Sequence, residues 1–250
     1  IGGFSLGLER TGGFETVAFC EIEEFPRRVL AKHWPKVKCY HDVRELTADT
    51  LRRDGIAVDV ITGGFPCQDV SVAGKQAGME GGTRSGLWSE IVRLVGELRP
   101  QFVIVENVAN LLSGPRQKRG GWFGRILGDL AEIGYDAEWH CIPASYIGAW
   151  HRRDRIWVVA YPNEISRQQR KPERALLEIG NLLQQFEGGF ARWPGRPNLP
   201  KSRICGRNDG VSDVPHRLAA LGNAIVPQIV ELIGSAILEA LEALEAENDH

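Results

Sequence analysis

The chain has 250 residues, 43% of them hydrophobic and 25% charged, which is ordinary for a soluble globular protein with one substantial core. No apolar run reaches the length that crosses a membrane, and the five cysteines are odd in number and scattered, without a C-x-x-C pair. The composition therefore excludes a membrane-spanning protein, argues against a disulfide framework or a structural zinc site, and predicts a reducing cytoplasm.

The net charge of −2 conceals an uneven distribution of charge along the chain. Between His151 and Arg217, thirteen Lys and Arg residues oppose seven Asp and Glu residues, a local balance of +6, and no Lys or Arg follows Arg217. A basic face of this kind suits phosphate groups, although a solvated charged surface has the same composition.

The first residues, I-G-G-F-S-L-G-L, predict a glycine turn that enters a short helix. Such a turn normally follows a strand, so we expect the chain to be a fragment whose first strand is missing. The next strand is predicted over residues 16–20, with Glu21 at its carboxyl end, where a dinucleotide-type fold binds ribose hydroxyls. A further strand over residues 39–43 places Asp42 at its end. Simple solvation of a strand end is the alternative for both acids.

An apolar, β-branched run over residues 58–61 stops at Gly63-Gly64 and leads into Pro66-Cys67-Gln68. This pattern is typical of a buried strand followed by a loop, and the loop here presents a thiol. Pro66 restricts the backbone before Cys67, and the glycine-rich residues that follow, as far as residue 86, predict a mobile lid. An inert buried cysteine remains the alternative.

Amphipathic helices are predicted over residues 88–98 and 122–133, and a long helix from about residue 228. Strands are predicted over residues 102–105, 137–142 and 155–160. The alternation of strands and helices predicts an α/β protein with a doubly wound, mostly parallel sheet. The periodicity fades over residues 162–214, which we interpret as a small, loop-rich recognition region. It divides a catalytic domain (residues 1–161) from a C-terminal return to that domain (residues 215–250).

Three polar residues stand at or beside the ends of predicted strands: Cys67, Glu106 and Arg155. A thiolate is a strong nucleophile, and a carboxyl group in a strand-end pocket can have a raised pKa and act as an acid. Arg155 precedes its apolar run. It therefore lies at the opposite rim of the sheet unless that strand is antiparallel.

Four motifs, G-F-P-C-Q-D-V-S-V-A-G, V-E-N-V, R-R-D-R-I-W and L-G-N-A-I-V-P, resemble in order and spacing those of the cytosine-C5 DNA methyltransferases of bacterial or phage type. The resemblance covers nearly the whole chain except residues 162–214. It implies a Rossmann-like methyltransferase sheet with one antiparallel strand, which would bring Arg155 to the rim that carries Cys67 and Glu106.

The resemblance implies a DNA (cytosine-5-)-methyltransferase that transfers a methyl group from S-adenosylmethionine to C5 of a flipped cytosine. Cys67 would add to C6, Glu106 would bind N3 and supply a proton, and Arg153 and Arg155 would lie near the base. The cofactor residues implied in the same way are Gly2, Gly3, Phe4, Glu21, Ile22, Asp42, Val43, Pro66 and Asn223. Those implied for the substrate and lid are Gln68, Ser71, Lys75 and Arg84.

The same resemblance implies double-stranded DNA as the partner, no metal, and a monomer in the cytoplasm of a bacterial or phage-infected cell, with a paired restriction endonuclease as a further candidate partner. Three alternatives stay open. One is a tRNA cytosine-C5 methyltransferase of the same superfamily, and the second is a catalytically dead DNA-binding fragment. The third is a cysteine hydrolase, for which no histidine carries a recognisable partner signature.

Overall fold

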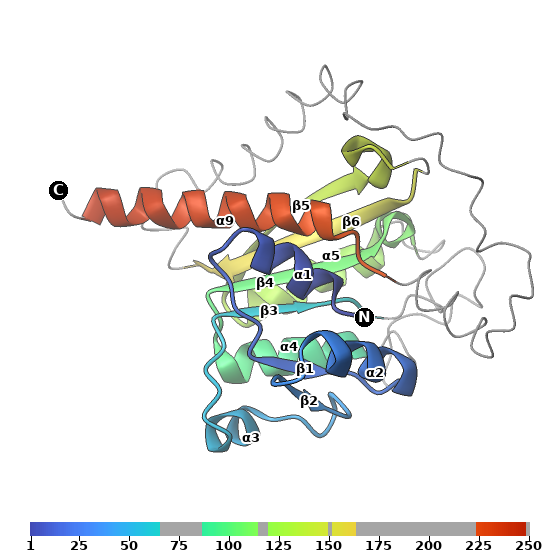
Figure 1. The fold of residues 1–250 in the computed structure, drawn as a ribbon. Coiled ribbons are helices and arrows are strands. Elements are labelled where there is room, and N and C mark those ends of the chain that lie inside the picture. The colour runs from blue at the N-terminus through green and yellow to red at the C-terminus, as the bar shows by residue number, and fades with distance from the viewer. Residues whose placement is uncertain (66–86, 115–119, 150–151, 164–223, 249–250) are drawn as a thin grey trace, which may run out of the picture.

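The computed structural model describes residues 1–65, 87–114, 120–149, 152–163 and 224–248 (Figure 1). Helices and strands alternate along most of these residues, as predicted. The elements are α1 (Gly3–Arg10), β1 (Ala18–Cys20), α2 (Glu24–His33), β2 (Lys38–Tyr40), α3 (Ala48–Arg53), β3 (Val60–Gly63), α4 (Trp88–Leu98), β4 (Phe102–Val108), η2 (Ala109–Leu112), α5 (Gly121–Glu132), β5 (Tyr135–Pro143), η3 (Ala144–Ile147), β6 (Asp154–Pro162) and α9 (Pro227–Asn248).

Four strands form the main sheet in the order β3-β4-β6-β5. β3 and β4 are parallel, whereas β6 is antiparallel to both β4 and β5. The antiparallel strand implied by the resemblance is thus confirmed. β1 and β2 pair in parallel as a separate two-stranded sheet, because no strand among the described residues hydrogen-bonds to both β1 and β3.

Helices cover both faces of the main sheet. On one face, Leu8 of α1 and Ile233 of α9 pack in a cluster with Ile104 and Trp157, and Figure 1 shows α9 crossing the sheet beside α1. On the other face, helices α4 and α5 bury an apolar cluster that includes Val105. Since both faces are buried, β4 begins as a continuous apolar run. The three layers make the fold Rossmann-like.

Several elements differ from the sequence prediction. β2 ends at Tyr40 instead of residue 43, so Asp42 lies two residues beyond the strand and not at its end. β4 continues to Val108 instead of ending at residue 105, because its pairing with β6 extends as far as Val108. Glu106 therefore lies inside the strand, near its carboxyl end. Helix α3 was not predicted, although Thr47 caps it by accepting a hydrogen bond from the Thr50 amide at 3.2 Å.

Within the described ranges, no helix combines the length and apolarity that a membrane crossing requires.

Candidate active site

The carboxyl end of β4 presents Glu106 to Arg155 of β6. Arg155 pairs with Val108 in the antiparallel register, two residues beyond Glu106, so both side chains lie on the same face of the sheet. The Arg155 Nε atom is 2.9 Å from the Glu106 Oε1 atom, and both side chains are largely buried. The antiparallel direction of β6 thus brings together two of the predicted catalytic residues.

Burial raises the pKa of the Glu106 carboxyl above its ordinary value, while the charges of Arg155 and Arg153 act against that shift. The net direction is upward, so the protonated form persists to a higher pH than in an exposed glutamate. A carboxyl group of this kind can donate a proton and then remain beside a guanidinium that stabilises its charge.

The chain leaving β3 lies beside Glu106. A Cβ atom built on Gly64 would lie 3.0 Å from the main-chain oxygen of Glu106. The next carbonyl, that of Phe65, accepts a hydrogen bond from the Asn107 Nδ2 atom at 3.2 Å. Asn107 is buried and also accepts a hydrogen bond from the Val108 amide at 2.8 Å. Its side chain therefore fixes the exit from β3 against β4, a role that we had not assigned to the asparagine of V-E-N-V.

Arg153 lies close enough to Glu106 to influence its pKa, and the Arg153 Nη2 atom donates to the Ala224 carbonyl at 2.8 Å. Its φ of 40° is in the left-handed region, which is uncommon for a side chain other than glycine. Arg153 thereby joins the rim of the sheet to the segment that precedes α9.

Trp157 connects this rim to the first helix. It pairs with Glu106 across the sheet, and its ring meets the edge of Phe4 at a centroid distance of 5.9 Å. The indole Nε1 atom of Trp157 is buried and has no hydrogen-bond partner among the described residues. A buried N–H group without a partner is costly.

A second group of predicted residues gathers at the carboxyl ends of β1 and β2. Cys20 pairs with Tyr40, and the Glu21 amide donates to the Tyr40 carbonyl at 3.0 Å, so Glu21 and Asp42 follow neighbouring strand ends. Ile22 is 49% exposed, a large apolar side chain in water beside two acids.

Asp42 forms an ion pair with Arg44 and also accepts a hydrogen bond from the Arg44 amide at 2.9 Å. Hydrogen bonds from the Arg44 side chain and amide lower the pKa of Asp42 to about 2, so it is ionised at neutral pH. A carboxylate has lone pairs for further donors. An apolar surface flanked by two such acceptors fits an adenosine, whose ring has an apolar face and whose ribose and amine donate hydrogen bonds.

The glycine turn before α1 lies between these two groups. Gly2 has a φ of 82°, and a side chain there would overlap the ring of Trp34, which in turn meets Phe19 of β1 at a centroid distance of 5.4 Å. A Cβ atom on Gly3 would lie 2.8 Å from the Ile225 Cβ atom. The two glycines therefore allow the start of α1 to pack between β1 and the segment before α9.

Several predicted site residues lie outside the described residues. They are Pro66, Cys67, Gln68, Ser71, Lys75, Arg84 and Asn223.

Helices on both faces of a mostly parallel sheet, with acidic side chains near the carboxyl ends of β1, β2 and β4, define a Rossmann-like α/β protein of the type that binds nucleotide cofactors. The sequence model of the C-5 cytosine-specific DNA methylases matches residues 1–188, and the chain belongs to that family.

Curated relatives include type II methyltransferases of bacteria. The chain is 34% identical over 164 residues to M2.BsuMI of Bacillus subtilis, covering 64% of this chain and 39% of the relative. It is 33% identical over 210 residues to M.HgiBI of Herpetosiphon aurantiacus, covering 82% of this chain and 46% of the relative. The chain thus spans less than half the length of these relatives.

Solved structures show the same fold. A protein described as a DNA modification methyltransferase encoded within an E. coli prophage aligns with a TM-score of 0.53 and 26% identity, over 66% of this chain and 44% of that one. A DNMT2 variant from Spodoptera frugiperda aligns with a TM-score of 0.51 and 18% identity, over 65% of this chain and 47% of that one.

Proposed function

We propose that this protein transfers a methyl group from S-adenosylmethionine to C5 of a cytosine in double-stranded DNA. The observation that supports it best is the buried pair of Glu106 and Arg155, whose glutamate lies beside Gly64, two residues before Pro66-Cys67 in the chain. Cys67 follows Phe65 by two residues, so its Cα atom is at most about 7.6 Å from that of Phe65. The proposal takes the Cys67 thiol and the Glu106 carboxyl to reach the same pyrimidine ring.

In this proposal, the Cys67 thiolate adds to C6 of a flipped cytosine while Glu106 donates a proton to N3. The resulting enamine makes C5 nucleophilic. S-adenosylmethionine supplies an electrophilic methyl group to C5. Loss of the C5 proton then restores the C5–C6 double bond and expels the Cys67 thiolate, and the N3 proton returns to Glu106. Arg155 keeps the ionised Glu106 in place and presents its remaining donors to the O2 edge of the base.

One of the residues proposed for the cofactor, Phe4, lies close to those proposed for the base. Phe4 contacts Trp157, the cross-strand neighbour of Glu106, so the start of α1 and the acid share one face of the sheet. Glu21 would accept from the ribose hydroxyls, Ile22 would cover one face of the adenine, and Asp42 would accept from its amine. The donor and the base would then meet at one end of the sheet.

We propose residues 162–214 as the part that reads the DNA target. Their nine Lys and Arg residues against six Asp and Glu residues suit phosphate contacts, and the family model ends at residue 188, within them. A monomer in a bacterial cytoplasm, with a restriction endonuclease of matching target, completes the proposal.

A covalent trap tests the chemistry directly. Duplex DNA of random sequence carrying 5-fluorocytosine should form a stable adduct in the presence of S-adenosylmethionine, because fluorine cannot leave C5 as a proton does. Mass spectrometry should find the adduct on Cys67, and Cys67→Ala should abolish both the adduct and methyl transfer to ordinary DNA.

The matched control is Cys141→Ala, which removes an exposed thiol on β5 and should leave the adduct intact. An adduct on another cysteine would reject the mechanism. If the adduct forms only with RNA that carries 5-fluorocytosine, the substrate is RNA and not DNA.

A further inference from the structure

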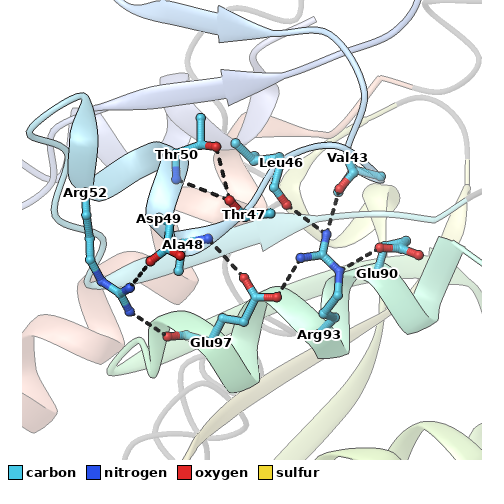
Figure 2. A network of polar contacts seen from close by, with 10 residues as sticks. All are labelled: Val43, Leu46, Thr47, Ala48, Asp49, Thr50, Arg52, Glu90, Arg93 and Glu97. Atoms are coloured by element: carbon cyan, nitrogen blue, oxygen red, sulfur yellow. Dashed lines mark hydrogen bonds and ion pairs between the residues drawn. The ribbon is translucent and has the colours of Figure 1, made fainter.

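One guanidinium holds the loop that follows β2. The Arg93 Nη2 atom donates to the main-chain carbonyls of Val43 at 2.9 Å and Leu46 at 2.8 Å (Figure 2). Arg93 belongs to α4, which lies far along the chain from this loop, and its side chain is only 31% exposed. A single nitrogen with two carbonyl acceptors sets the distance between the two ends of the loop.

Two glutamates of the same helix hold the Arg93 side chain in position. Its Nε atom is 2.8 Å from the Glu90 Oε2 atom, and its Nη1 atom is 2.8 Å from the Glu97 Oε1 atom. The spacings of three and four residues place all three side chains on one face of α4. Because the guanidinium is a rigid planar fork, fixing two of its nitrogens also fixes the direction of the third.

Glu97 extends the same row to the start of α3. Its Oε2 atom accepts a hydrogen bond from the Ala48 amide at 3.0 Å (Figure 2). The face of α4 that carries Glu90, Arg93 and Glu97 therefore binds the main chain at residues 43, 46 and 48, and it clamps the whole connection between β2 and α3.

The clamp reaches Asp42 through one peptide group. The Val43 carbonyl and the Arg44 amide belong to the same planar unit, so holding the carbonyl also orients the N–H. That N–H donates to the Asp42 Oδ1 atom at 2.9 Å. The position of the Asp42 carboxylate thus depends on the Arg93 guanidinium, although the two side chains do not touch.

We infer that Arg93 is a positioning residue for the adenine end of the methyl donor, acting through the Val43–Arg44 peptide on Asp42 and Val43. This rests on the proposed function, in which those two residues bind the adenine. Arg93 touches neither the donor nor the base, so its loss weakens donor binding and leaves the chemical step unchanged.

Calorimetric titration with S-adenosylmethionine, and with 5′-methylthioadenosine as a probe of the adenosine half, tests this inference. Arg93→Met should raise the Kd of both ligands about tenfold, which corresponds to about 1.4 kcal/mol. Arg93→Lys keeps the charge but lacks the planar fork of donors. Its Kd values should lie between those of Arg93→Met and those of the unaltered protein. In steady-state methyl transfer, the KM for the donor should rise while kcat at saturating donor stays within about twofold.

Arg52→Met is the matched control. Arg52 bonds Asp49 and the Glu97 carbonyl in the same network, yet it touches neither Val43 nor Leu46 (Figure 2). Its side chain is 64% exposed, so its ion pair contributes little, and the Kd should not change.

Hydrogen exchange, measured without any ligand, tests whether Arg93 holds the loop that follows β2. The amides of Glu45 and Leu46 both donate to the Asp42 carbonyl, at 3.1 and 3.2 Å, and should exchange faster in Arg93→Met without any ligand. Unchanged exchange would overturn the clamp. Unchanged Kd values would overturn the inference but leave the proposed function intact. If the unaltered protein binds neither ligand, the cofactor part of the proposed function fails, and the inference fails with it.

Discussion

At the scale of single residues, the site depends on the balance between burial and charge at Glu106. Burial favours the neutral carboxyl, and the two arginines favour the carboxylate. Because the net shift of the Glu106 pKa is upward, the protonated form that can donate to the base persists to a higher pH than in an exposed glutamate.

Removing Arg155 should move this balance in a defined direction. Arg155 lowers the pKa of Glu106, so Arg155→Met should raise that pKa further. Because the protonated form donates to N3, the fall in single-turnover rate with rising pH should shift to higher pH. Titration of the Glu106 carboxyl by ¹³C NMR measures the pKa directly, with Glu106→Gln identifying the signal.

Glu106→Gln should also slow single-turnover methyl transfer by about 10²- to 10⁴-fold, the usual contribution of a general acid. It should leave Cys67 available for alkylation.

For Arg155→Met, a pKa of Glu106 that falls instead of rising would contradict the assignment of the ion pair.

At the scale of elements, the link between β3 and β4 sets where the loop with the thiol begins. Asn107 is a buried polar residue whose amide donates to a carbonyl just beyond the end of the neighbouring strand. β3 and β4 already pair through their main chains. The Asn107 side chain is therefore not needed for that pairing, and it instead fixes the course of the chain after β3.

Asn107→Ala should destabilise the protein by about 1–3 kcal/mol for each buried group left without a partner, namely the Phe65 carbonyl and the Val108 amide. It should also reduce methyl transfer, because the exit from β3 loses its anchor. Urea denaturation and single-turnover assays measure the two effects.

Leu130→Ala serves as a control for Asn107→Ala that is destabilised without losing the anchor. Leu130 is fully buried in α5, and its truncation should cost about 2–5 kcal/mol through the cavity it leaves. If Leu130→Ala lowers the rate as much as Asn107→Ala under conditions where both are folded, Asn107 has no specific part in positioning the loop.

At the scale of the whole molecule, the packing of α1 against α9 joins the two ends of the described chain. A Cβ atom on Gly7 would lie 2.5 Å from the Val230 Cβ atom, and on Gly234 it would lie 2.9 Å from the Leu8 Cδ2 atom. The two helices therefore approach closely only because glycine occupies both positions.

Gly7→Ala should destabilise the protein by about 1–3 kcal/mol, since the methyl group pushes α1 away from α9. Gly128→Ala is the opposite case, because that position in α5 is exposed and has no atom within 4 Å of the added Cβ. It should stabilise the protein by about 0.5–1 kcal/mol through helix propensity. Thermal unfolding measures the direction of each change, and equal shifts in Tm in the two variants would refute the close contact between α1 and α9.

Much of this architecture could be predicted from the sequence. The apolar run at residues 102–105, the periodic spacing in α4 and α5, and the glycines after β3 are local signals, and each corresponds to an observed element. The motifs around Cys67, Glu106 and Arg155 also predicted the family, because residue type and order are written in the chain itself.

The residues of β6 left open whether Arg155 lies at the rim that carries Glu106, and only the resemblance implied it. The tertiary structure decided it, since the direction of β6 depends on which strand it pairs with and not on its own residues. The roles of Asn107, Trp157 and Arg93 were likewise decided by neighbours distant in sequence. A polar residue in a strand or on an amphipathic helix has the same local pattern whether it faces water or holds another main chain, and the difference arises only when the elements pack.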